Sequence, residues 1–180
     1  MAILEDRHVL GSAAKLAADA SGITGLIFAG AIFGFFYAWV CSTMWGLDQA
    51  DPRVAIIAMQ EMNRSVRNAV FAPAFFGTPF VLALAAVLNR RAGFGRTAIW
   101  MALAAVIYGV GGMFLTMKVN VPMNEALGAL DISLETKLSD AHDIWKAYSG
   151  KWQLWNTVRT LFSGLSLMCV GLGLLARIKM

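Results

Sequence analysis

The sequence predicts an all-α integral membrane protein in which four transmembrane helices form a bundle. Apolar residues make up 58% of the 180 residues and charged residues only 14%, whereas about a quarter of the residues of a soluble domain are charged. Four stretches without a charged residue approach the roughly 20 residues that a helix needs to cross a bilayer. They are residues 21–47, 69–88, 97–117 and 160–176. Because these stretches are continuous apolar runs and not alternating patterns, helices are favoured over a β-barrel.

The first 20 residues are predicted to form a short amphipathic segment at the membrane interface. They carry acidic and basic residues along their whole length, which is not the pattern of a cleaved signal peptide. Apolar side chains that can face lipid or protein recur through the segment: Ile3, Leu4, Val9, Leu10 and Leu16. Residues 21–180 contain no low-complexity linker and no clear repeat, so they are predicted to form a single transmembrane domain.

The distribution of basic residues predicts the orientation of the bundle. Four spans place the N-terminal segment, the loop at residues 90–96 and the C-terminus on one side, where seven residues are basic and three are acidic. The other side then carries equal numbers of basic and acidic residues. By the positive-inside rule both termini are cytoplasmic, and in a bacterium the membrane is the inner one. The net charge of +4 is explained by this topology, so no nucleic-acid partner is expected.

The first span carries glycines that suit close helix packing. Gly30 and Gly34 have GxxxG spacing, which lets helix backbones approach where lipid is as apolar as the helix. Such a face serves packing inside the bundle, or contact with a second copy or another membrane protein, unless it only reflects the frequency of glycine in membrane helices. Cys41 and Cys169 lie at different depths, so we expect free thiols and no disulfide. No zinc or haem motif is present.

Two helices are predicted to extend beyond the bilayer on the non-cytoplasmic side. Asp51 can cap a helix with Pro52 in its first turn, and no breaker follows before Asn68. One helix of about 37 residues should therefore run from there through the second span. Another long helix is predicted from residue 139 to residue 177, through the fourth span. The third span is expected to end before Pro122, because proline forbids a simple continuation.

Polar and aromatic side chains fall on one stripe of each projecting segment. The fourth helix carries six of them at helical spacing: Trp145, Tyr148, Trp152, Trp155, Asn156 and Arg159. The second helix and the end of the third span contribute the others: Gln60, Asn63, Arg67, Asn120, Asn124 and Glu125. Three separate segments therefore bring arginines, amides and indoles to the same outer level of the membrane.

Each of these residues also has a purely structural explanation. Tryptophan and tyrosine at this depth commonly form an aromatic belt, and Asn120 before a proline can cap a helix. Arg159 can extend to lipid headgroups, but on the stripe of Asn156 and beside an apolar run it is expected to face the bundle and to need partners. The residues alone leave a structural hydrogen-bond network and a ligand pocket open. His142 lies near acidic residues, but on a solvated helical segment it is not expected to bind a metal.

Three motifs resemble the anthrone oxygenase-like family of four-helix integral membrane proteins, many of which are known only as a domain of unknown function. They are MQEMN at residues 59–63, VNVPMNEAL at residues 119–127 and WxxWNxVRT at residues 152–160. The resemblance covers nearly the whole chain from the first span onward. The matching positions are Gln60, Asn63, Asn120, Pro122, Asn124, Trp152, Trp155, Asn156 and Arg159.

The resemblance implies an oxygenase that oxidises an anthrone or a similar polycyclic phenolic molecule with molecular oxygen, using no metal, flavin or other cofactor. The residues implied to stabilise the anion formed during catalysis are Arg159, Asn120, Asn124 and Asn156. The residues implied to contact the substrate are Trp152, Trp155, Gln60 and Asn63. A base, if one is needed, would be Glu125 or His142.

A second function from another class stays open at this point. The chain can be a non-catalytic membrane component that binds a lipid or a quinone, or an accessory subunit of a larger membrane complex. The glycine-rich face of the first span suits such docking. A transporter is not favoured, because no charged residue or broken helix is expected at mid-membrane.

Overall fold

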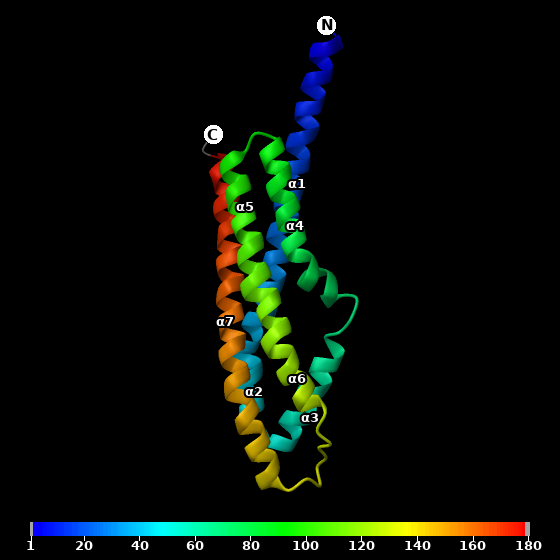
Figure 1. The fold of residues 1–180 in the computed structure, drawn as a ribbon, viewed down its shortest axis with the longest axis vertical. Coiled ribbons are helices and arrows are strands. Elements are labelled where there is room, and N and C mark those ends of the chain that lie inside the picture. Colours follow the sequence, from blue (N-terminus) through cyan, green and yellow to red (C-terminus); the bar gives the residue numbers. More distant parts are fainter. Residues whose placement is uncertain (1, 179–180) are drawn as a thin grey trace.

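Residues 2–178 are described by a computed structural model, in which helices form nearly all of the chain (Figure 1). The elements are α1 (Ala2–Ala38), the π-helical η1 (Trp39–Thr43), α2 (Met44–Asp48), α3 (Pro52–Ser65), α4 (Phe71–Arg91), α5 (Gly95–Ile107), the π-helical η2 (Tyr108–Phe114) and η3 (Thr116–Asn120), α6 (Val121–Gly128) and α7 (Leu138–Ile178).

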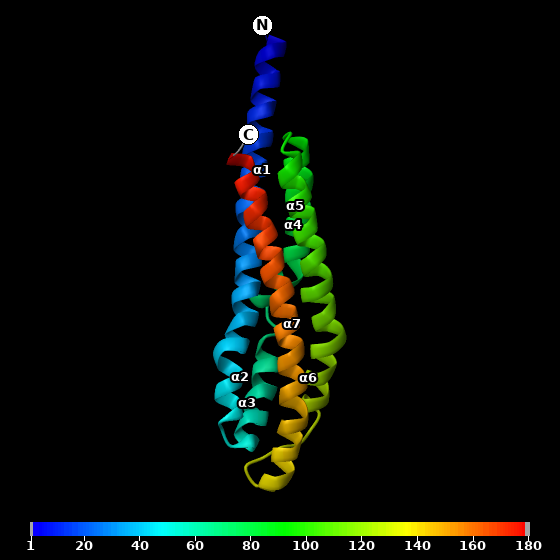
Figure 2. The same cartoon turned by 90° about the vertical axis from the view of Figure 1, so that its left-hand side faces the viewer.

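Four helical segments are long and apolar enough to cross a membrane, which confirms the predicted fold class. They are Gly11–Asp48, Phe71–Arg91, Gly95–Gly128 and Leu138–Arg177. These segments run side by side, with α1 packed against α4, α4 against α5, α5 against α7 and α7 against α1 (Figures 1 and 2). Within residues 2–178 no strand is present.

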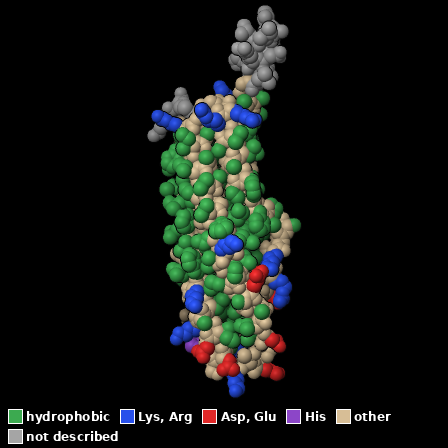
Figure 3. Space-filling model, viewed as in Figure 1, with side chains coloured by type: hydrophobic (Ala, Val, Ile, Leu, Met, Phe, Trp, Pro, Cys, Tyr) green, Lys and Arg blue, Asp and Glu red, His purple; other side chains and the backbone are tan. Residues whose placement is uncertain are grey.

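The surface has the charge pattern of a membrane protein. A wide band of hydrophobic side chains separates an end that shows Lys and Arg from an end that shows charges of both signs (Figure 3). The first end holds the loop between α4 and α5 and the end of α7, and α1 enters the bundle there (Figure 1). Large apolar side chains in the band, such as Phe80 and Leu161, are 70% and 64% exposed, as expected of residues that face lipid.

The N-terminal segment is continuous with the first span. The backbone of α1 is helical from Ala2 to Ala38 without interruption. The side chains of residues 1–10 lie outside the described residues, and with them the predicted lipid contacts of Ile3, Leu4, Val9 and Leu10. Leu16 is 70% exposed.

The second span is not one helix with the segment before it, so the prediction of a single helix of about 37 residues is wrong. The chain leaves the helix at residues 66–70, between α3 and α4. Pro73 explains the break, because its ring would clash with the carbonyl of Ala69 and it has no N–H to donate. Asn68 then caps the new helix: its Oδ1 accepts from the N–H groups of Val70 and Phe71 at 2.8 and 2.9 Å.

A second proline, Pro79, is tolerated inside α4. It has no N–H for the carbonyl of Phe75, and the hydroxyl of Tyr108 donates to that carbonyl at 2.9 Å instead. A neighbouring helix thus satisfies the backbone group that the proline leaves unpaired, as is usual in membrane helices.

The third span does not end at Pro122 as predicted, and helical structure continues to Gly128. The chain reaches the proline through the π-helical η2 and η3, and the N–H of Val121 bonds to the carbonyl of Thr116, five residues earlier. A wider turn of this kind accommodates a proline that an α-turn would exclude. As a result α6 stays in line with α5, and Asn120 and Asn124 remain on one helix side.

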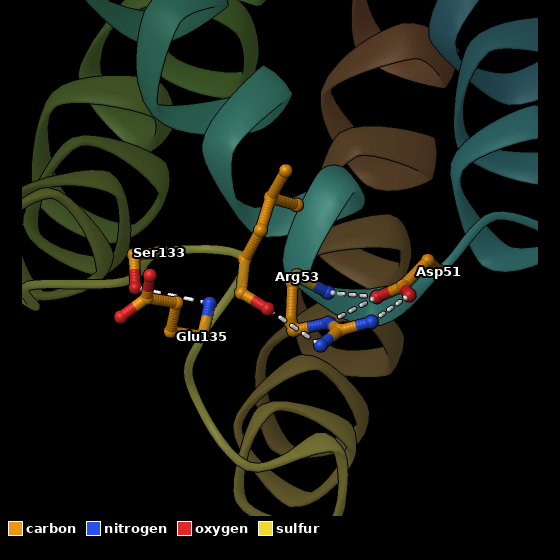
Figure 4. A network of polar contacts seen from close by, with 5 residues as sticks. Asp51, Arg53, Ser133 and Glu135 are labelled. Atoms are coloured by element: carbon orange, nitrogen blue, oxygen red, sulfur yellow. Dashed lines mark hydrogen bonds and ion pairs between the residues drawn. The ribbon is translucent and has the colours of Figure 1, made fainter.

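The long fourth helix and the start of α3 agree with the sequence. Helix α7 is uninterrupted from Leu138 to Ile178, so it projects well beyond the apolar band. Asp51 caps α3 by accepting from the backbone N–H of Arg53 at 2.9 Å. The Arg53 guanidinium pairs with Asp51 at 2.6 Å and donates to the carbonyl of Leu134 at 2.7 Å (Figure 4). These bonds fasten the loop before α7 to the beginning of α3.

Candidate functional site

A cavity of about 1,070 Å³ opens where the chain enters the second span. The connector at residues 66–70 and the first turns of α4 form one side, and α1, η3, α6 and α7 form the others. The cavity therefore exists because α3 and α4 are separate helices. A cavity of this volume can hold a molecule of the size of a drug or a cofactor.

Aromatic side chains make up much of the cavity wall. Seven of them line it: Phe35, Phe36, Trp39, Phe71, Phe75, Phe76 and Trp152. The rings of Phe71 and Phe75 stack with centroids 5.4 Å apart, and those of Trp39 and Trp152 meet at 5.1 Å. Such walls favour a flat, apolar ligand with an aromatic ring system.

Arg159 contributes a buried positive charge to this cavity. Its side chain lies on α7 and is only 5% exposed. The guanidinium carbon lies 4.3 Å from the ring centre of Phe36 and 5.2 Å from that of Trp152. Among the side chains that the structure describes, no carboxylate forms an ion pair with Arg159. Aromatic faces offset part of the desolvation of the cation, but no counter-charge neutralises it.

Two polar side chains fix the direction of the guanidinium. Its Nε donates to Oδ1 of Asn156 at 3.0 Å, and Nη1 donates to Oγ1 of Thr116 at 3.2 Å. Asn156 is itself held, because its Nδ2 donates to the carbonyl of Phe36 at 3.2 Å. Helices α1, α7 and the η3 segment thus meet at Arg159, and within the described residues Nη2 forms no hydrogen bond.

Asn124 is the centre of a second set of hydrogen bonds. Its Oδ1 accepts from Nε1 of Trp152 at 2.8 Å and from the hydroxyl of Tyr148 at 2.9 Å, and its Nδ2 donates to Oδ1 of Asn63 at 2.8 Å. These bonds join α6 to α7 and to α3. They hold the indole of Trp152 in place as a wall of the cavity.

Asn120 lies between these two groups and has no hydrogen-bond partner in the part of the chain that the structure describes. It is fully buried, one turn from Thr116 and one turn from Asn124, and neither atom of its amide forms a hydrogen bond within the described residues. The same holds for Nδ2 of Asn63. An unpaired buried amide costs about 1–3 kcal/mol, so Asn120 is not explained by packing alone.

Two predicted substrate contacts lie elsewhere. Gln60 donates to the carbonyls of Leu127 and Leu130 at 2.9 and 3.0 Å and so caps the end of α6. Trp155 is 38% exposed and does not line the cavity. The structure thus brings Arg159, Asn124, Asn63 and Trp152 to the cavity, whereas Gln60, Trp155, Asn120 and Asn156 do not line it.

The two candidate bases also lie far apart in the fold. Glu125 lines the cavity and pairs with Arg67 at 3.2 Å. His142 lies near the start of α7, beside Asp143 at 3.5 Å, and does not line the cavity.

Sequence reasoning missed several residues that build the site. Thr116 lies four residues before Asn120, and that spacing was a usable signal. Phe36 and Trp39 come from the first span, where no charged or amide side chain marks them. Asp48 was missed as well: it accepts from Trp145 Nε1, Ser149 Oγ and Gln153 Nε2 at 2.9, 2.6 and 2.8 Å, and so ties α2 to α7.

The chemical capacity of the arrangement follows from these parts. A fixed cation in an apolar cavity attracts an anionic oxygen far more strongly than it would in water, because little solvent screens the charge. The aromatic walls accept the rest of a planar molecule. The cavity is thus suited to an aromatic ligand with an acidic hydroxyl or an enolisable carbonyl.

Comparison with known proteins agrees with the resemblance of the motifs. The family model described as anthrone oxygenase matches residues 62–169, a range that includes Asn63, Thr116, Asn124, Trp152 and Arg159. Neither the curated proteins nor the solved structures include a significant match to the chain. Since the family model covers more than half of the sequence, the chain belongs to the anthrone oxygenase family.

Proposed function

We propose that this protein is a membrane-embedded oxygenase that acts on an aromatic, polycyclic phenolic molecule of the anthrone type, without metal or flavin. The observation that carries the proposal is Arg159, a buried guanidinium that faces an aromatic cavity and has no carboxylate partner among the described side chains. Membership of the anthrone oxygenase family supports the reaction type.

The proposed chemistry needs little from the protein beyond anion stabilisation. An anthrone carries a methylene group opposite its carbonyl, and loss of one methylene proton gives an electron-rich enolate. The enolate reacts with molecular oxygen, and the net reaction converts anthrone and O₂ into anthraquinone and water. One oxygen atom becomes the new carbonyl and the other leaves as water. The negative charge of the enolate oxygen is placed beside Arg159, where a fixed donor contributes about 2.7–4 kcal/mol to such a step.

The asparagines have different parts in this proposal. Asn156 holds Arg159 in the direction of the ligand, and Asn124 holds Trp152 as a stacking wall. Within the described residues Asn120 has both amide atoms unpaired and Asn63 has its Nδ2 unpaired, so these two amides remain able to take a further hydrogen bond during the reaction.

The location of the cavity fits a substrate that dissolves in the membrane. With both termini on the cytoplasmic side, the cavity lies at the non-cytoplasmic edge of the apolar band. The connector beside the cavity carries Val70, which is 88% exposed and would meet lipid at this level. An apolar three-ring molecule concentrated in the bilayer therefore reaches the cavity without crossing water.

A second function is supported by a different surface. Gly30 and Gly34 on α1 have open space where a side chain would be, so another helix can pack closely against them. This favours a non-catalytic component that binds a lipid or quinone in the cavity and docks through α1, either to a second copy or to a larger membrane complex.

The test uses the full-length protein in lipid nanodiscs. An anthrone is added under ¹⁸O₂, and quinone formation above the spontaneous rate is followed by absorbance and mass spectrometry. The proposal predicts acceleration, one ¹⁸O atom in the product carbonyl, and loss of at least about 99% of the acceleration in Arg159→Met. No acceleration by the wild type, together with a co-purifying lipid or quinone in native mass spectrometry, would instead establish the non-catalytic function.

A further inference from the structure

Only three charged side chains line the cavity within the described residues, and one of them is a carboxylate. They are Arg67, Glu125 and Arg159. Arg159 is buried, whereas the side chains of Arg67 and Glu125 are 60% and 59% exposed and pair with each other at 3.2 Å. The cavity therefore has a buried end with the positive charge of Arg159. At its exposed end lies Glu125, the one carboxylate among the described residues that line it.

Trp152 connects these two ends. Its ring centre lies 5.2 Å from the guanidinium carbon of Arg159, and its Nε1 donates to Asn124, the neighbour of Glu125 in the chain. Thr116, which contacts Arg159, precedes Glu125 by nine residues on the same helical stretch, so the two ends of the cavity lie about two helical turns apart. In an anthrone the carbonyl oxygen and the methylene carbon lie on opposite sides of the central ring, so a molecule lying against Trp152 can present the oxygen to one end of the cavity and the methylene group to the other.

We infer that Glu125 is the base that accepts the carbon-bound proton of the ligand whose carbonyl oxygen is held by Arg159. The inference rests on the proposed function, because that function requires a carbon acid. In this step the C–H bond breaks and its electron pair enters the ring system, so that the negative charge appears on the oxygen beside Arg159. The proton moves to the Glu125 carboxylate, which becomes a neutral carboxylic acid. No oxidant takes part.

The ion pair with Arg67 gives Glu125 its position. A carboxylate at the rim of an aromatic cavity would otherwise turn towards water, and Arg67 on the neighbouring connector keeps it beside the opening. A ligand that fills the cavity displaces water from the carboxylate, which makes proton transfer to it easier. A general base of this kind usually contributes a factor of about 10²–10⁴ to the rate.

The test separates proton removal from oxidation by excluding oxygen. An anthrone is bound to the protein in nanodiscs in anaerobic D₂O, and exchange of its methylene protons is followed by NMR. The wild type is expected to accelerate exchange, and Glu125→Gln to lose at least about 99% of that acceleration. Glu61→Gln is the matched control, since Glu61 also pairs with an arginine, Arg64, but does not line the cavity. It is expected to exchange like the wild type.

Chemical rescue distinguishes a base from a structural residue. Added formate is expected to restore exchange in Glu125→Ala, because a small carboxylate can occupy the space that the side chain leaves, and to leave Glu125→Gln unchanged. Wild-type exchange rates in Glu125→Gln, or no rescue in a Glu125→Ala protein that still binds the anthrone, would overturn the inference. So would a wild type that oxidises the anthrone in air but does not accelerate anaerobic exchange. A wild type that does neither contradicts the proposed function itself.

Discussion

Two arginines on α7 each lie over an aromatic ring and donate to an asparagine, but among the described residues only one of them pairs with a carboxylate. Arg177 lies 3.9 Å from the ring centre of Phe94 and donates to Oδ1 of Asn89 at 3.3 Å, much as Arg159 lies over Phe36 and donates to Asn156. Arg177, however, also pairs with Asp19 at 2.6 Å.

The difference between them separates a structural arginine from one that can bind a ligand. At Arg177 the carboxylate of Asp19 neutralises the guanidinium charge. The contacts of Arg177 with Asp19 and Asn89 join α7 to α1 and α4 at this end of the bundle. At Arg159 the amide and the aromatic ring are present, and a cavity lies on the side where a carboxylate would complete the set. A charge so buried is retained at a cost in stability, and function is the usual reason.

Ligand affinity should show the largest contrast between the two arginines. Arg159→Met is expected to weaken binding of 2-hydroxyanthraquinone by about 100-fold, or about 2.7 kcal/mol, because a charge-assisted contact in an apolar site is lost. Arg177→Met should leave the affinity within about twofold, because it lies at the other end of the bundle. Titration of each variant in nanodiscs by tryptophan fluorescence measures both. An equal loss of affinity in the two variants would contradict the view that Arg159 binds the ligand and Arg177 does not.

Stability should change in the opposite sense. Arg177→Met leaves the fully buried Asn89 without its donor and Asp19 without its partner, so we expect a loss of about 1–3 kcal/mol. Arg159→Met removes an unneutralised buried charge, and it should leave the thermal unfolding temperature in detergent unchanged or raise it. A clear fall in that temperature for Arg159→Met would show that Arg159 is a structural residue.

The two asparagine partners should repeat this contrast on a smaller scale. Asn156→Leu frees the Arg159 guanidinium to turn, and we expect about tenfold weaker binding of 2-hydroxyanthraquinone. Asn89→Leu should not change that affinity, but it should lower stability, since Asn89 also donates to the carbonyls of Ala18 and Ala85. Binding titrations and thermal unfolding of both variants test the pair. Unchanged affinity in Asn156→Leu would show that Arg159 does not depend on this bond.

A third arginine, Arg53, also pairs with a carboxylate, but this pair lies outside the membrane-spanning segments. Its hydrogen bonds lower the pKa of Asp51 to about 2 from an ordinary 3.8. Because the pKa is lower in the folded state, the stabilising effect is present above about pH 4 and is lost as the pH falls towards 2. Hydrogen exchange between pH 2 and 6 measures this loss as weaker protection of the amides in the first turn of α3 at low pH. We expect this effect to be smaller than those of the arginine and asparagine variants. In Asp51→Asn that pH dependence should vanish, and its persistence would exclude the pair as the cause.

The spans and the polar stripe could be predicted because each leaves a local pattern. Charge-free runs identify the four membrane-crossing helices, and Asp51 with Pro52 marks the start of α3. The helical spacing placed Trp152, Asn156 and Arg159 on one side of a long helix, and all three are buried, whereas Trp155 of the same predicted stripe is 38% exposed.

The cavity could not be predicted, because it depends on two prolines whose effects are opposite. Pro73 breaks a helix that its preceding residues favour, and Pro122 does not, since the π-helical η3 absorbs it. Which outcome occurs depends on the tertiary contacts around each proline. The aromatic residues that α1 contributes to the cavity could not be predicted either, because in the sequence Phe36 and Trp39 do not differ from apolar residues that face lipid.

The ionisation of a bound phenol tests most directly whether Arg159 is an anion site. The absorption spectrum of 2-hydroxyanthraquinone differs between its phenol and phenolate forms, so the pKa of the bound molecule can be read by titration in nanodiscs. A neighbouring cation favours the phenolate, whereas burial in an apolar cavity alone favours the phenol. We predict that the pKa of the bound phenol falls below its value in lipid without protein, and that the fall disappears in Arg159→Met but not in Arg177→Met. A bound phenol whose pKa is unchanged or raised in the wild type would contradict the assignment.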